Sequence, residues 1–221
     1  MGKNTAQIPV HLILGLIFLI AIFAGCSRAY YGAMEKVGLH KRDILVDRVE
    51  AARDAQSKAQ EQFQSALEQF SAIVKIENTD LKNAYEKLNA EYEDSEKAAA
   101  IVSDRIGRVA SVADALFEEW EHELGLYQNT DLRASSSRQL QETKTRYRDM
   151  LASMHRAESS MPPVLHTFRD NVLFLKHNLN AQAIGSLRLE FSTLKGEIDA
   201  LIEEMSSAIE MSNQFISSIK Q

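Results

Sequence analysis

Cysteine, proline and glycine are all scarce in this sequence, and each scarcity excludes something. The 221 residues include one cysteine, three prolines and nine glycines. A single cysteine rules out a disulfide framework, so stability has to come from packing. The prolines are Pro9, Pro162 and Pro163, and proline is the residue that most disturbs a helix interior. Most of the chain is therefore free to be helical, which the low glycine content also favours.

The sequence also has no excess of basic residues. The chain has 25 Lys and Arg residues against 31 Asp and Glu residues, which gives a net charge of −6 at pH 7. An acidic surface repels the phosphates of nucleic acids, so we do not expect DNA or RNA to be a partner.

The one long apolar run lies at the N-terminus, between Ile8 and Phe23. Lys3 makes the start of the chain basic, and two small residues follow the run. A basic start, an apolar middle and a small-residue end are typical of a secretory signal peptide. The run is also close to the roughly 17–25 residues that cross a bilayer, so an uncleaved inner-membrane anchor stays open as an alternative.

Phe23-Ala24-Gly25-Cys26 resembles the lipobox of bacterial lipoproteins, with Phe23 where that family usually has Leu. The resemblance implies that a diacylglycerol is attached to the sulfur of Cys26, that the signal peptide is then cut between Gly25 and Cys26, and that the new N-terminus is acylated with a palmitate-type chain, so that these chains enter the membrane lipid. Two or three acyl chains on one residue give stable anchoring. Ser27 follows the cysteine where Asp would favour the inner membrane, so the resemblance implies the outer membrane, facing the periplasm.

After this segment, apolar residues recur at alternating steps of four and three, which predicts long helices with coiled-coil-like seams. The longest seam runs through Leu81, Tyr85, Leu88, Tyr92, Ser95, Ala99, Val102, Ile106, Val109, Ala113, Leu116, Trp120, Glu123 and Tyr127. Similar seams cover residues 45–73, where the polar Gln56 is expected to fix the register of the helices, and residues 187–219. The fold class expected is all-α: an elongated antiparallel helical bundle preceded by a lipoprotein signal peptide.

Three features predict where the helices end. Residues 78–80 (Asn-Thr-Asp) offer turn and N-cap chemistry before the longest helix. Residues 162–163 (Pro-Pro) are expected to end a weakly patterned helix over 131–160, because the residue before a proline disfavours helical geometry. A stop near 178–180 is supported by a hydrophobic staple between Leu179 and Ile184.

The chain divides into three parts on these signals. We predict a cleaved signal peptide (residues 1–25), a lipidated N-terminus with a membrane-proximal linker (26–43) and a helical bundle (44–221).

Glu119-Trp120-Glu121-His122 contains the Glu-x-x-His spacing used by di-iron bundles. Such a site needs a second copy, and the sequence has none. The seam places Trp120 in the core and His122 outward, so we interpret this stretch as a solvated face. The sequence has no glycine-rich phosphate loop and no nucleophile motif. We therefore expect no enzyme activity, no catalytic residue, no metal and no cofactor.

Two further clusters each have two interpretations. Small residues around Ala99 and Ala110 either let neighbouring helices approach closely, which we favour, or leave a cavity for a lipid or other apolar ligand. The basic residues after Cys26 either contact anionic head groups or belong to a solvated linker. They are Arg28, Lys36, His40, Lys41 and Arg42.

Three stretches carry a second resemblance: YYGAMEKVGLHKRDILVDRVEAARDAQ (30–56), EQFQSALEQF (61–70) and VLFLKHNLNAQAIGSL (172–187). They are similar to the bacterial family catalogued as domain of unknown function 2959. The resemblance implies a secreted or lipid-anchored helical protein of Gram-negative bacteria. That family has no assigned activity, so it implies no functional residue.

The leading hypothesis is an outer-membrane lipoprotein whose bundle is a periplasmic spacer or interaction adaptor. Its expected partners are membrane lipid through Cys26, an unidentified envelope protein, or a second copy of the chain. The alternatives are a carrier that holds a lipid near Ala99 and Ala110, and an inner-membrane signal-anchored coiled-coil protein.

Overall fold

The computed structural model describes residues 40–75, 80–178 and 181–220. These residues form four helices: α2 (Lys41–Lys75), α3 (Leu81–Leu124), α4 (Thr130–His177) and α5 (Ala181–Lys220). No strand occurs within those three ranges. The prediction of an all-α bundle is confirmed, and α2 begins three residues before the boundary predicted between linker and bundle.

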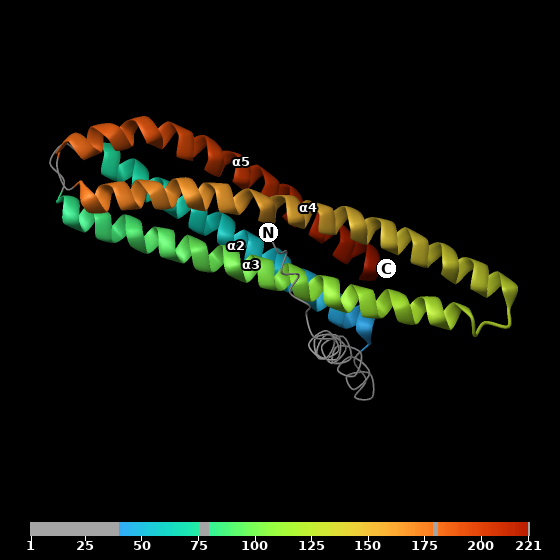
Figure 1. The fold of residues 1–221 in the computed structure, drawn as a ribbon. Coiled ribbons are helices and arrows are strands. Elements are labelled where there is room, and N and C mark those ends of the chain that lie inside the picture. The colour runs from blue at the N-terminus through green and yellow to red at the C-terminus, as the bar shows by residue number, and fades with distance from the viewer. Residues whose placement is uncertain (1–39, 76–79, 179–180, 221) are drawn as a thin grey trace, which may run out of the picture.

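The four helices pack as a closed ring. α2 packs against α3 and α5, and α4 packs against the same two helices on the opposite side. Figure 1 shows the resulting bundle, in which successive helices run in opposite directions. At 1.5 Å per residue, the 48 residues of α4 span about 72 Å and the 44 residues of α3 about 66 Å. The bundle is therefore long and narrow.

The two ends of the bundle differ. At the end where α4 is followed by α5, all four helices are present (Figure 1). At the other end, α3 and α4 continue past the start of α2 and the end of α5, and residues 125–129 connect them. We call this second end the open end, and we call residues 120–136, which project from it, the hairpin tip.

The predicted seams form most of the core, although Leu81, Tyr85 and Tyr92 of α3 are only half-buried. All nine seam positions of α2 are buried, and so are the seam positions of α3 from Ser95 to Leu116. Trp120 is only half-buried, and Glu123 and Tyr127 are exposed. Trp120 still packs against the edge of the core. The prediction that Glu123 and Tyr127 continue the seam is wrong, because α3 has there passed the start of α2 and the end of α5.

The prediction that Pro162 and Pro163 end a helix is also wrong, since both lie inside α4. The two prolines are exposed, so the carbonyl groups that lose their amide partners lie on the solvent side, where water can satisfy them. On the inner side, Met161 and Val164 are almost completely buried. Packing of these neighbours holds the backbone helical despite the missing hydrogen bonds.

The helix starts follow capping chemistry. The carboxylate of Asp80 accepts hydrogen bonds from the amides of Lys82 and Asn83, at 3.1 and 3.2 Å, which confirms the predicted N-cap of α3. Asn129, which was not predicted as a cap, caps the start of α4 in the same way. The predicted stop near 178 is confirmed, because Asn178 ends α4. The proposed staple involves Leu179, which lies outside the described residues.

Aromatic contacts tie the core together near the open end. The ring of Tyr147 on α4 packs edge-on against Phe117 of α3, with centroids 5.3 Å apart, and in a tilted arrangement against Phe215 of α5, with centroids 6.1 Å apart. Tyr147 is buried, and burial, with a further contribution from the charge of Asp114, raises the pKa of its phenol. On α3, burial and a hydrogen bond to Glu96 raise the pKa of Tyr92 to about 12.

The buried phenol predicts a loss of stability in alkali. The unfolded phenol ionises near pH 10 while the folded one stays protonated, so its contribution is complete below about pH 10 and falls as the pH rises further. We expect Tyr147→Phe to shift the alkaline unfolding midpoint to higher pH, as followed by far-ultraviolet circular dichroism. Tyr92→Phe should shift it less, because the pKa of Tyr92 is raised less. Equal midpoints in wild type and Tyr147→Phe would contradict this account.

Candidate functional site

The predicted lipidation residue, Cys26, and the cleavage site after Gly25 lie outside the described residues. Within the described helices, none is long and apolar enough to cross a membrane. The bundle itself offers three candidate surfaces: a pocket and the hairpin tip at the open end, and a groove near the opposite end. A fourth candidate feature is a buried polar side chain without a hydrogen-bond partner.

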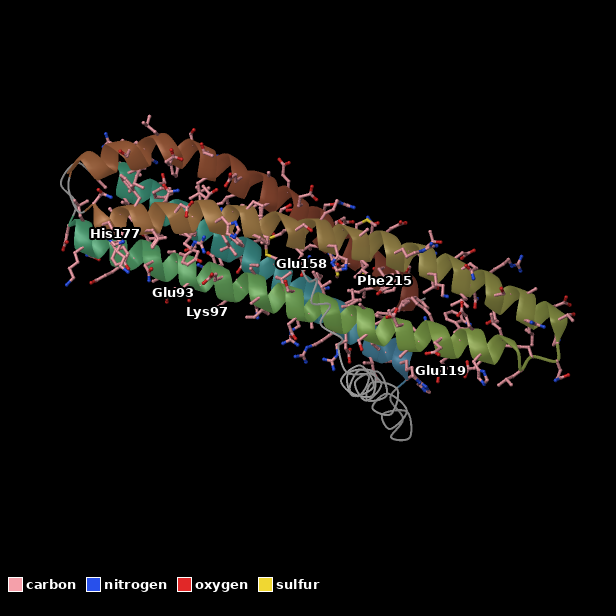
Figure 2. The ribbon with its side chains drawn as sticks, in the orientation of Figure 1. Glu93, Lys97, Glu119, Glu158, His177 and Phe215 are labelled. Carbon is pink, nitrogen blue, oxygen red and sulfur yellow. The ribbon has the colours of Figure 1, made fainter. Side chains whose placement is uncertain are left out.

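The Glu-x-x-His stretch does not assemble into a metal site. Glu119 accepts a hydrogen bond from the ammonium of Lys41, with Nζ and Oε1 2.7 Å apart, and His122 is exposed. Figure 2 shows Glu119 at the open end, where α2 begins. In the three described ranges, no group of three or more His, Cys, Asp or Glu side chains is arranged to hold a metal ion.

The pairing of Lys41 changes the interpretation of the basic cluster. Lys41 is 8% exposed, so it belongs to the bundle and is not placed to contact lipid head groups. His40 and Arg42 are exposed at the open end, while Arg28 and Lys36 lie outside the described residues. Of the described members, only two remain available for head groups.

A pocket of about 580 Å³ opens where α2 starts and α5 ends. Its apolar floor comes from Leu116, Trp120 and Ile219. Its charged rim is formed by Arg42, Glu119, Glu123, Glu142 and Arg146. The pocket exists because two of the four helices stop at this level, and its charges of both signs do not select a ligand class.

The hairpin tip is held together at its base. The indole of Trp120 donates a hydrogen bond to the hydroxyl of Ser136 at 2.8 Å, and Lys144 pairs with Glu121 at 2.5 Å. These contacts join α3 to α4 directly, without help from α2 or α5. The tip is therefore a fixed projection, and Ser136 lies in the part of α4 that the sequence predicts as a weakly patterned helix.

A second concave surface, which we call the far groove, lies between α4 and α5 towards the opposite end. It encloses about 550 Å³ and is lined by Thr167, Asp170, Asn171, Phe174, Ser186, Leu187, Leu189, Glu190 and Thr193. Leu189 is 78% exposed at its edge, and Phe174 is 38% exposed. Both residues lie outside the predicted seams. A large apolar residue at a position that the pattern places on the solvent side is the sequence signal that could have revealed this groove.

The small residues of α3 line neither of the two concave surfaces described above. Ala99 is buried and Ala110 is half-buried, and neither lines the pocket at the open end or the far groove. Gln56, by contrast, is fully buried in α2, and neither its amide nitrogen nor its oxygen has a hydrogen-bond partner. It is the one polar seam position of α2, as the sequence indicated.

A model of the family described as a protein of unknown function (DUF2959) matches residues 30–219. The chain belongs to this family. The match covers α2, α3, α4 and all but the last residue of α5, so the resemblance found in three short stretches extends over the bundle. No curated protein and no solved structure matches the chain. For this DUF2959 member, the candidate surfaces are therefore identified from the geometry of the bundle alone.

Proposed function

We propose that the protein is an outer-membrane lipoprotein, anchored through acylated Cys26, whose helical bundle is a rigid periplasmic spacer or interaction adaptor. The observation that carries the proposal is the small-residue and cysteine pattern at 24–26, directly behind an apolar run. The length of the bundle, about 70 Å along α3 and α4, supports a spacer.

The buried seams favour a spacer over a carrier. Side chains from all four helices fill the core along its length, including Phe63, Leu88, Met154 and Leu201, each less than 1% exposed. A carrier has to leave room for its ligand between such layers, whereas a spacer gains stiffness from closing them. The far groove, with Leu189 and Phe174 at its surface, supports the adaptor version, because exposed apolar patches mark interaction sites.

Anchoring is expected to depend on one sulfur atom. Cys26→Ser should abolish incorporation of labelled palmitate and leave an uncleaved, slower-migrating precursor that is still exported. Membrane fractionation of the wild type should place the label in the outer membrane, and Ser27→Asp should move it to the inner membrane. Equal labelling of wild type and Cys26→Ser would show that the protein is not a lipoprotein of this kind.

A soluble form of the chain that starts at Ser27, and so has neither the apolar run nor the acyl anchor, separates the spacer from the carrier. Native mass spectrometry of this preparation should give the mass of the chain alone. A lipid that co-purifies in stoichiometric amount would favour the carrier.

A further inference from the structure

The hairpin tip carries apolar side chains that the bundle does not need. Leu126 is 65% exposed, Tyr127 is 41% exposed and Leu132 is 58% exposed. None of the six residues from 125 to 130 is charged. Three exposed apolar side chains around an uncharged turn form a small surface that gains free energy if it leaves water.

The tip lies at the same end of the bundle as the start of α2 (Figure 1). The contact between Lys41 and Glu119 fixes this level, and α3 then continues for five residues to Leu124, a rise of about 8 Å, before the turn that carries Leu126. Fifteen residue steps separate Cys26 from Lys41, which limits their distance to roughly 50 Å. A membrane that holds acylated Cys26 is therefore within reach of the tip.

The charges around the tip select the kind of surface. Residues 120–136 carry Glu121, Glu123 and Asp131 against Arg133. Glu121 is paired with Lys144, so the tip keeps a small excess of negative charge, which an anionic membrane would repel. A zwitterionic surface carries no such penalty. Tyrosine is favoured at the boundary between head groups and acyl chains, because its ring is apolar and its hydroxyl is polar.

We propose that the hairpin tip docks into a zwitterionic lipid surface through Leu126, Tyr127 and Leu132, beside the acyl anchor. The proposal rests on the proposed function, because it takes the membrane that holds Cys26 as the docking surface. It adds a second contact with the membrane and so sets the bundle at a defined orientation, with the far groove directed away from the lipid.

The test uses the full acylated chain in phosphatidylcholine vesicles. A Leu126→Cys variant is labelled with an environment-sensitive fluorophore, which reacts only there because the sulfur of Cys26 carries the lipid. The matched control is Leu189→Cys, an exposed apolar position on the far groove. We expect the label at 126 to shift its emission to shorter wavelength and to be quenched by brominated lipid, and the label at 189 to do neither. Adding phosphatidylglycerol should weaken both effects at 126.

The outcomes separate the tip from the anchor. If the acylated protein sediments with the vesicles and the label at 126 behaves like the label at 189, the tip proposal is overturned and the anchor stands. If mass analysis shows that Cys26 is not acylated and the protein stays in the supernatant, both proposals fail. If the label at 126 leaves water only when a second protein is added, the surface is a protein-docking site and the lipid proposal is overturned.

Discussion

Phe168→Ala is expected to lower the free energy of unfolding by about 3–5 kcal/mol, the range for truncating a fully buried aromatic side chain. Phe168 is 0% exposed on α4, and its ring packs edge-on against Tyr92 of α3 with centroids 5.8 Å apart. It also follows the two prolines of α4 by less than two turns, so it is one of the side chains that hold this part of the helix in place. Urea unfolding followed by circular dichroism gives the difference.

Trp120→Ala is the matched comparison, because the sequence pattern places both Trp120 and Phe168 at seam positions and so predicts that both aromatic side chains are buried. Since Trp120 is half-buried and makes one hydrogen bond, to Ser136, we expect a smaller loss of about 1–2 kcal/mol. His122→Ala, on the exposed face, should change the stability by no more than about 0.5 kcal/mol. A loss for Trp120→Ala as large as that for Phe168→Ala would contradict the projecting hairpin tip.

Gln56→Met is expected to raise the free energy of unfolding by about 1–3 kcal/mol. The Gln56 side chain is completely buried and its amide has no partner, so folding removes the amide from water without replacing its hydrogen bonds. Methionine has a similar length and shape and carries no such penalty. Thermal and urea unfolding of the variant measure the gain.

Ser95→Ala is the control for this prediction. Ser95 is an equally buried polar seam residue on α3, but its hydroxyl donates to the carbonyl of Glu91 at 2.7 Å. Removing it should leave the stability nearly unchanged or slightly lower. A clear loss on Gln56→Met would mean that the amide has a hydrogen-bond partner, such as an internal water molecule. If Gln56 also fixes the register, Gln56→Met should show a broader distribution of oligomeric states in size-exclusion chromatography.

The sequence predicts the core of this protein better than its ends. Steps of four and three located the buried face of α2 at every position, because each of those residues has two neighbouring helices. The same steps failed at Glu123 and Tyr127, since periodicity predicts which face of a helix is buried and not how far its neighbours extend. How far each helix extends past its neighbours depends on where all four helices begin and end, and this becomes apparent only in the packed structure.

Pro162 and Lys41 show two other limits of the sequence. The proline rule is local, and it does not include the core packing that keeps α4 helical through residues 162–163. Lys41 was grouped with basic neighbours along the chain, but its partner Glu119 lies 78 residues away. Of the candidate features, only the buried polar side chain of Gln56 could be predicted from the sequence, because a polar residue at a seam position stands out from the apolar pattern.

The ring of helices has a consequence for the order in which the protein folds. α3 and α4 follow each other and are joined by a short turn, so their pairing forms early and locally. α2, however, needs α5 as its second neighbour, and α5 is the last segment to emerge during synthesis or export. Until then, the apolar side of α2 that later packs on α5 stays open to water and to other chains. The first of the four described helices is therefore fully packed only after the last of them has been made, and the period before the ring closes is when the chain is most exposed to aggregation.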